Sequence, residues 1–248
     1  MTTQDPEAKA AFLQRVREAI GRTAPLEYVP DYPPLKSAAV RQEEKVRTIE
    51  ARSLARRDRI VETYLENAAR AGWRVHRVWS PEDAADAVGD IAQGIRAKTV
   101  ARSAEDLFRA VDVDGALRRN RANPVVLAAG RSRSRADVRR LAFEADMGVT
   151  GVAYAIAETA SCVITPRKGV ARVTSLAPPV YAAIVRAEQV LETLDDYFAL
   201  VRHQHQRSRT RSFNYANFIS GPSRTGDIEQ TLTIGVHGPG EVHLVLIS

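Results

Sequence analysis

The chain of 248 residues has a single cysteine, Cys162, and only five of its 36 basic residues are lysine. One thiol excludes an intramolecular disulfide, and it cannot supply the four thiolates that usually hold an iron–sulfur cluster. We therefore expect no iron–sulfur cluster in this chain. No Gly-x-Gly-x-x-Gly motif follows the first expected strand, and His237 and His243 have no acidic or cysteine companion, so we also expect no other cofactor and no metal site. Within a strand, the lone Cys162 is expected to act as a small buried apolar side chain.

Long apolar runs are also missing. No stretch approaches the roughly 20 apolar residues that a membrane-spanning helix requires. The first residues, MTTQDPEAKAAFLQRVREAI, include early acidic residues and contain no apolar signal core. The sequence therefore predicts a cytoplasmic protein with neither a secretion signal nor a membrane span.

The charge pattern gives no sign of a nucleic-acid site. The net charge is +6, from 36 basic and 30 acidic residues that are dispersed along the chain. A basic excess attracts anions, but nucleic-acid binding is usually accompanied by clustered basic residues. We expect a small anionic metabolite as partner and no nucleic acid.

The N-terminal part is predicted to lie outside the main domain. Glu7–Ile20 has the apolar spacing of an amphipathic helix, and Thr23–Lys36 contains four prolines. Prolines exclude a regular helix or a central strand, so this segment is expected to be an extended strap over the surface. We place the helix and strap in residues 1–39 and one α/β domain in residues 40–248.

In that domain, helical and strand patterns alternate. Helices are expected at 40–71, 80–94, 134–147 and 188–201, part of 106–120 is expected to be helical, and 202–212 is expected to be a loop. Strands are expected at 73–79, 98–101, 124–129, 160–165 and 180–185. Alternation of this kind predicts a mostly parallel, Rossmann-like sheet with flanking helices.

The C-terminal stretch combines three short apolar runs with two polar connections. The runs at 217–220, 232–236 and 242–247 are each expected to be buried strands. Between the first two lies GPSRTGD, whose backbone N–H groups, hydroxyls and guanidinium suit a phosphate or carboxylate. The predicted substrate-binding residues in it are Gly221, Ser223, Arg224, Thr225 and Asp227. Alternatively, Ser223 or Thr225 caps a short helix.

Two further residues are candidates for catalysis. Glu158 follows a run of small residues just before a strand, so it can act as a base or nucleophile in a cleft. Alternatively, it caps a turn or pairs with an arginine; Thr159 beside it is a candidate for substrate binding. His237 can transfer protons or simply hydrogen-bond the Gly-Pro-Gly turn after it. We expect Glu158 and the GPSRTGD turn to face one another across one site, because loops that follow parallel strands converge.

Three stretches carry a family resemblance: ISGPSRTGDIEQTL, GVHGPGEVHLVLI and, upstream, VTGVAYAIAETASCVI. They resemble the lactate-utilisation protein C family, whose defining unit is the LUD domain. The resemblance implies a sheet related to the ribose-5-phosphate isomerase, glucosamine-phosphate deaminase and CoA-transferase group. In the CoA-transferases a glutamate forms the acyl intermediate, and the context of Glu158 partly matches that residue.

The same resemblance implies a role in oxidising L-lactate to pyruvate together with cysteine-rich iron–sulfur proteins. The chain would then be the cluster-free, substrate-binding or structural subunit. Two alternatives stay open: a free-standing enzyme on a phosphorylated or CoA-linked small acid, and a non-catalytic regulatory binding module. The sequence leaves homo-oligomerisation open, and it does not decide whether this chain is itself an enzyme.

Overall fold

The structure is a computed structural model that describes residues 6–19, 21, 39–128, 134–165, 167–207, 215–226 and 232–248. The chain divides into two compact units, Met1–Ala38 and Ala39–Ser248. In the first unit, helix α1 spans Pro6–Ala19 as the apolar spacing predicts. The Pro-rich strap of Thr23–Lys36 lies outside the described residues, so its extended form stays a prediction.

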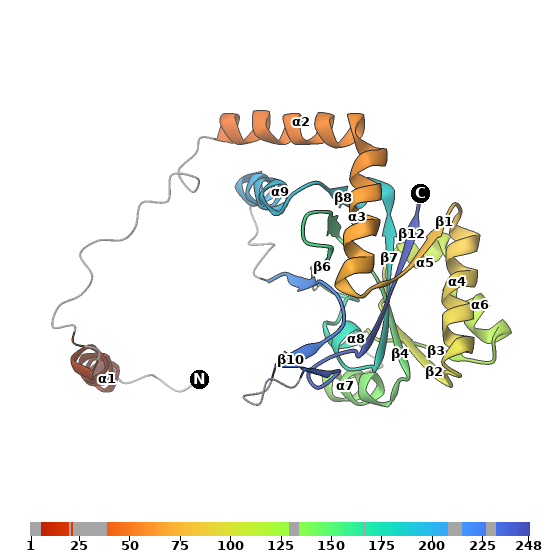
Figure 1. Cartoon of the computed structure of the whole chain (residues 1–248). Coiled ribbons are helices and arrows are strands. Elements are labelled where there is room, and N and C mark those ends of the chain that lie inside the picture. The colour runs from red at the N-terminus through yellow and green to blue at the C-terminus, as the bar shows by residue number, and fades with distance from the viewer. Residues whose placement is uncertain are drawn as a thin grey trace. The chain divides into compact units, whose positions relative to one another are not determined.

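The second unit is built on a six-stranded sheet (Figure 1). Its strands, in spatial order, are β1 (Arg74–Val78), β12 (Glu241–Ile247), β7 (Val180–Arg186), β4 (Met147–Gly151), β2 (Thr99–Arg102) and β3 (Asn123–Val126). Every neighbouring pair in this sheet is parallel. The α/β prediction is therefore confirmed, and this sheet is wholly parallel. Parallel sheets are covered on both faces, which explains the apolar runs of β7 and β12, the latter interrupted by His243.

Helices cover both faces of the sheet. They are α3 (Arg57–Ala71), α4 (Pro81–Gly94), α5 (Leu107–Ala110), α6 (Val113–Arg119), α7 (Arg135–Glu144) and α8 (Val173–Leu176). Figure 1 shows α4 and α6 on one side and α3 on the other. The core is split accordingly: Tyr64 of α3 packs with Tyr181 and Leu244, whereas Val88 of α4 packs with Ile184.

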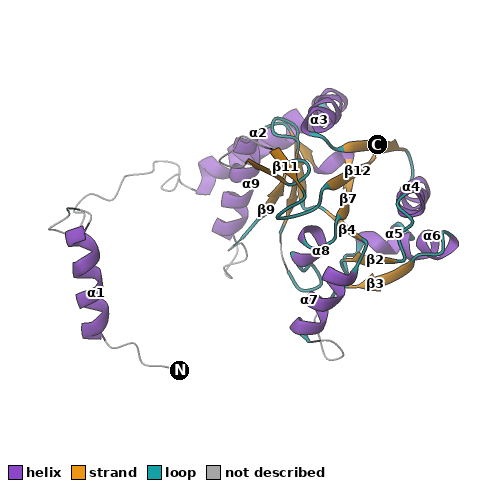
Figure 2. Cartoon of the chain, turned by 60° about the horizontal axis from the view of Figure 1, so that its bottom comes forward, coloured by secondary structure: helices purple, strands orange, loops and turns teal. Residues whose placement is uncertain are grey.

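A smaller mixed sheet contains β8 (Val190–Leu191), β5 (Tyr154–Ile156), β6 (Ser161–Ile164) and β9 (Asn217–Ile219), in that spatial order. Helix α2 (Ala39–Ala55) packs beside α9 (Leu194–Arg207), as Figure 2 also shows. Two strands, β10 (Arg224–Gly226) and β11 (Leu232–Ile234), pair as a separate antiparallel ladder.

Local helix signals located α4 well. Ser80 accepts a hydrogen bond from the backbone N–H of Asp83, and Pro81 occupies the first helical position, as expected. Ser134 and Asp137 cap α7 reciprocally, so that helix starts where predicted. Within the part of the chain that the structure describes, no helix is both long and apolar enough to cross a membrane.

Four predictions about elements were wrong. The helix expected over 134–147 ends at Glu144, and Met147 begins the buried strand β4. The helix expected from Glu188 begins only at Leu194, because Val190 and Leu191 are buried in a strand that pairs with β5. Residues 202–207, expected to be a loop, continue that helix. Of the three C-terminal runs, only β12 is buried; β11 pairs with β10 alone and leaves Ile234 exposed.

Candidate functional site

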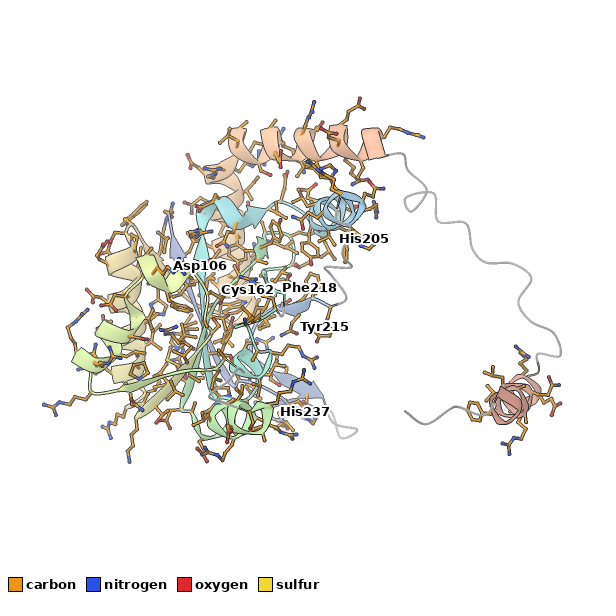
Figure 3. All side chains as sticks on the ribbon, turned by 180° about the vertical axis from the view of Figure 1, so that it is seen from behind. Asp106, Cys162, His205, Tyr215, Phe218 and His237 are labelled. Carbon is orange, nitrogen blue, oxygen red and sulfur yellow. The ribbon has the colours of Figure 1, made fainter. Side chains whose placement is uncertain are left out.

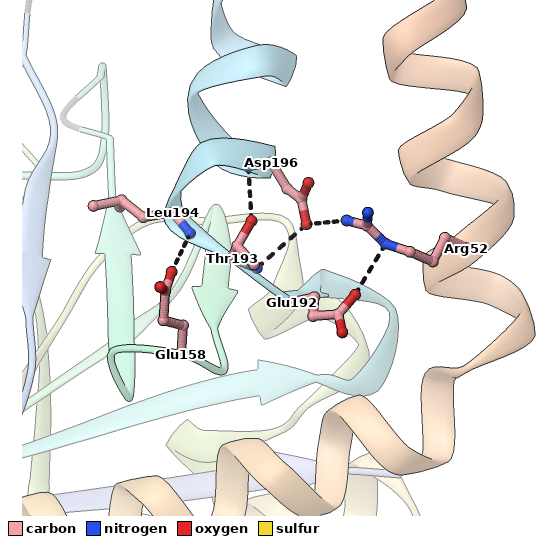
Figure 4. A network of polar contacts seen from close by, with 6 residues as sticks. All are labelled: Arg52, Glu158, Glu192, Thr193, Leu194 and Asp196. Atoms are coloured by element: carbon pink, nitrogen blue, oxygen red, sulfur yellow. Dashed lines mark hydrogen bonds and ion pairs between the residues drawn. The ribbon is translucent and has the colours of Figure 1, made fainter.

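Glu158 lies in the turn between β5 and β6 and contacts the start of α9. Its Oε2 accepts a hydrogen bond of 3.0 Å from the backbone N–H of Leu194, the first residue of that helix (Figure 4). The first N–H groups of a helix lack partners within it and carry the positive end of the helix dipole, so a carboxylate there is stabilising. The alternative for this exposed residue was to cap a turn or to pair with an arginine, whereas the observed contact is with the N-terminus of a helix.

A chain of hydroxyl groups connects the two stretches that the sequence singled out. Thr159 Oγ1 lies 2.7 Å from Ser161 Oγ, which lies 2.6 Å from Ser220 Oγ. Ser220 immediately precedes Gly221 and the rest of GPSRTGD. These hydroxyl contacts require β6 and β9 to lie side by side, and the two strands do pair, in antiparallel register.

The residues of the GPSRTGD turn form a packed connection to the C-terminus of α3. Gly221 has a φ of +114°, and a Cβ there would lie 2.5 Å from the carbonyl oxygen of Ala71. Arg224 Nη2 donates a 3.1 Å hydrogen bond to the same carbonyl. Carbonyl groups at the end of a helix lack partners within it, so Arg224 supplies a donor to one of them.

The other side of this turn is tied to the HGPG loop before β12. The backbone N–H of Ser223 donates to the carbonyl of Pro239, and the N–H of Gly235 donates to the carbonyl of Ser223. Thr225 stands opposite Thr233 in the β10–β11 ladder. Asp227 lies outside the described residues. The turn therefore begins a β-ladder, and the predicted short helix with its cap at Ser223 or Thr225 is wrong.

The contacts of Glu158 and Arg224 lead to different helices. Glu158 contacts α9, whereas Arg224 contacts α3, and the hydroxyl chain to Ser220 is the described link between their segments. These contacts do not join the two side chains across one site. Sequence reasoning expected both stretches to face one another across one site, but it did not anticipate that Glu158 and Arg224 contact the ends of two different helices.

A pocket of about 1060 Å³ lies between α7, α8 and residues 235–238. His237 and Gly238 line it, whereas Ser223 and Arg224 do not. Arg135, Arg139 and Arg172 also line it, above an apolar surface that includes Val138, Phe143, Val173, Leu176 and Val236. The sequence analysis missed these arginines. The sequence pattern that could have indicated them is the i, i+4 spacing of Arg135 and Arg139, which puts both on one face of α7.

A second polar cluster that sequence reasoning missed lies where β2 and β4 end. The almost fully buried carboxylate of Glu105 accepts hydrogen bonds from Ser103 Oγ and from the backbone N–H of Gly151, the latter at 2.9 Å. Arg167 Nη2 lies 3.3 Å from the same carboxylate. The carboxyl edge of a parallel sheet is where ligands bind in such folds, but here protein donors already occupy the carboxylate.

The one cysteine of the chain lies in the protein core. Cys162 is fully buried with its sulfur 3.1 Å from the Tyr64 hydroxyl, and burial raises the pKa of the thiol to about 12. This confirms the expected apolar role of Cys162. In the described part of the chain, no group of three or more His, Cys, Asp or Glu is placed to hold a metal ion.

The sequence was compared with protein-family profiles, and the LUD domain profile matches residues 61–247. The chain belongs to the LUD domain family. Within the LUD domain fall β1 to β12 and every pocket residue named above; α1, α2 and the first turn of α3 precede it.

Curated relatives of this LUD domain include proteins named Lactate utilization protein C. The one from Exiguobacterium sp. (strain ATCC BAA-1283 / AT1b) is 39% identical over 119 residues, which is 44% of this chain and 47% of that protein. The one from Bacillus subtilis (strain 168) is 32% identical over 107 residues, or 43% and 44% of the two chains. The chain thus matches about half the length of these relatives.

A solved structure shares the fold of this LUD domain. The crystal structure of a DUF162 family protein from Deinococcus radiodurans superposes with a TM-score of 0.50 at 20% identity. The match covers 77% of this chain and 98% of that one. At this identity the comparison supports the α/β architecture alone.

Proposed function

We propose that this chain is a component of an assembly that oxidises L-lactate to pyruvate, working with iron–sulfur partner proteins. The observation that carries the proposal is the LUD domain match over residues 61–247, together with relatives named Lactate utilization protein C. The role in the assembly is that of a substrate-binding or structural subunit in the cytoplasm.

The chemistry of the chain favours a division of labour with partner proteins. Oxidation of lactate to pyruvate releases two electrons and two protons, so an electron acceptor is required. One cysteine cannot ligate a conventional cluster, and the pKa of Cys162 is raised to about 12 by burial, which opposes thiolate formation. Cysteine-rich partners that carry the clusters would accept the electrons.

A reconstitution experiment tests this proposal. The purified chain, its iron–sulfur partners and L-lactate are mixed with an artificial electron acceptor, and acceptor reduction is followed by absorbance. We expect reduction with all proteins present and a large loss when this chain is omitted. Equal acceptor reduction with and without this chain would show that the chain takes no part in the reaction.

A free-standing enzyme on a phosphorylated or CoA-linked small acid is the second candidate. It is favoured by the arginine-lined pocket beside His237 and by the proposed relation of the fold to the CoA-transferase group. This candidate predicts turnover of an acyl-CoA or acyl phosphate by the purified chain alone, measured by thiol or phosphate release. Ligand binding without turnover in either assay would instead support a regulatory binding module.

A further inference from the structure

The pocket between α7, α8 and residues 235–238 is lined by both cationic and apolar side chains. Arg135 and Arg139 come from α7, Arg172 from the residue preceding α8, and His237 from the loop before β12. Figure 3 shows His237 beside α7. Among the described lining residues there is no aspartate or glutamate. The described lining residues therefore present positive charge and no carboxylate that would neutralise it.

The three arginines have no carboxylate partner within the described residues. By contrast, Arg140, the next residue of α7, donates to Glu144 at 2.8 Å. The guanidinium of Arg139 lies 5.7 Å from the ring centre of Phe143, and that of Arg172 lies 4.5 Å from the ring centre of Tyr215. Cation–π contacts of this kind hold the guanidinium groups while leaving their N–H donors available.

Placing these cations together costs stability unless an anion is bound. Arg135 and Arg139 are four residues apart on one helix, and like charges at this spacing destabilise a helix. Arginine forms bidentate hydrogen bonds with phosphate, and several arginines suit a ligand with more than one anionic group. A bound polyanion would remove the repulsion and use the free donors.

We propose that this pocket binds a phosphorylated ligand of about nucleotide size that also carries an apolar or aromatic group. Its volume, about 1060 Å³, lies slightly above the roughly 300–1000 Å³ typical of ligand pockets, so a three-carbon acid would leave most of it empty. The walls formed by Val138, Phe143 and Val236 would contact the apolar part of the ligand. The inference does not require that the chain takes part in lactate oxidation.

Calorimetric titration of the full chain tests the site, with ADP as the probe and adenosine and pyrophosphate as its separate halves. We expect ADP to bind more tightly than either half, because it engages both the arginines and the apolar walls. Arg139→Ala and Arg172→Ala should each weaken ADP binding about tenfold or more, as expected for loss of a charge-assisted hydrogen bond.

Arg140→Ala is the matched control, because it removes the same charge from the same helix outside the pocket. Its affinity for ADP should stay within about twofold of the unmodified chain, and circular dichroism should show all variants folded. Absence of ADP binding at low ionic strength would overturn the inference. So would an Arg140→Ala effect equal to that of Arg139→Ala, which would indicate only general attraction by net charge. Neither result bears on the lactate reconstitution assay, which has its own readout.

Discussion

His76 on β1 and His243 on β12 stack with their ring centres 5.2 Å apart, and Nε2 of His76 lies 3.0 Å from Nδ1 of His243. One nitrogen of this pair must donate and the other accept, so the contact is lost when both rings are protonated. Nε2 of His243 lies 2.8 Å from the Glu241 carboxylate, which also forms an ion pair with Arg74. Burial is the main cause that lowers the pKa of both histidines. The charge of Asp90 on α4 acts to raise the pKa of His76.

Stability should therefore fall as the pH is lowered through the ordinary range of histidine. Because the folded-state pKa of each ring lies below its unfolded value near 6.5, the unfolded chain binds more protons in this window. Each proton taken up on unfolding contributes a slope of at most about 1.4 kcal/mol per pH unit. Urea unfolding between pH 7.5 and about pH 5 measures this, and His76→Asn should flatten the slope. His205→Asn, on the exposed end of α9, is the control and should leave the slope unchanged; an equal change in both would contradict the assignment.

Glu158 should contribute to stability as a cap of α9. Glu158→Ala leaves the N–H of Leu194 without its acceptor and should cost about 0.3–1 kcal/mol in urea unfolding, the usual contribution of an exposed carboxylate at a helix N-terminus. Glu158→Gln keeps an acceptor oxygen and should cost less. Glu66→Ala, which removes a carboxylate from the exposed face of α3, serves as the reference. If Glu158→Ala costs no more than that reference, the capping role is wrong.

Gly221 should be intolerant of a side chain, whereas Gly226 in the same turn region should accept one. A Cβ at Gly221 meets the Ala71 carbonyl at 2.5 Å in backbone with positive φ, but a Cβ at Gly226 meets nothing within 4 Å. Gly221→Ala is expected to cost about 1–3 kcal/mol and to lower the melting temperature. A melting temperature equal to that of Gly226→Ala would show that the chain does not approach α3 this closely.

Arg52 and Asp196 should be strongly coupled. Arg52 Nη2 lies 2.5 Å from the Asp196 carboxylate, which is only 7% exposed, and Arg52 also pairs with Glu192 (Figure 4). The Asp196 hydrogen bond and charge raise the pKa of Arg52. A double-mutant cycle should give a coupling energy of about 1–3 kcal/mol for this pair. The exposed Arg47–Glu43 pair should give about 0.5 kcal/mol or less, and similar values for both pairs would contradict the prediction.

The fold could be predicted where local sequence signals decide an element. Ser80 and Pro81 define the start of α4, and the apolar run of β12 requires burial on both faces. Val190 and Leu191 precede Leu194 by four and three residues, which is the spacing of one face of a helix. They nevertheless form a strand that pairs with β5. That pairing depends on a strand far along the chain, so no local pattern distinguishes it.

The candidate site was harder to predict because its charged groups have distant partners. The composition of GPSRTGD indicates an anion site, but Arg224 donates to Ala71, 153 residues earlier in the chain. The arginine pocket arises because α7, α8 and the loop at His237 meet in space. Only the spacing of Arg135 and Arg139 within α7 was visible in the sequence.

The place of β12 in the sheet has a consequence for biosynthesis. This strand lies between β1 and β7, and His76 of β1 meets His243 across 167 residues of sequence. During translation β1 must wait, without its parallel partner, until residues 241–247 have left the ribosome. Such distant contacts slow folding and leave an unpaired strand edge exposed to other chains. Completion of the sheet must therefore follow the synthesis of residues 241–247.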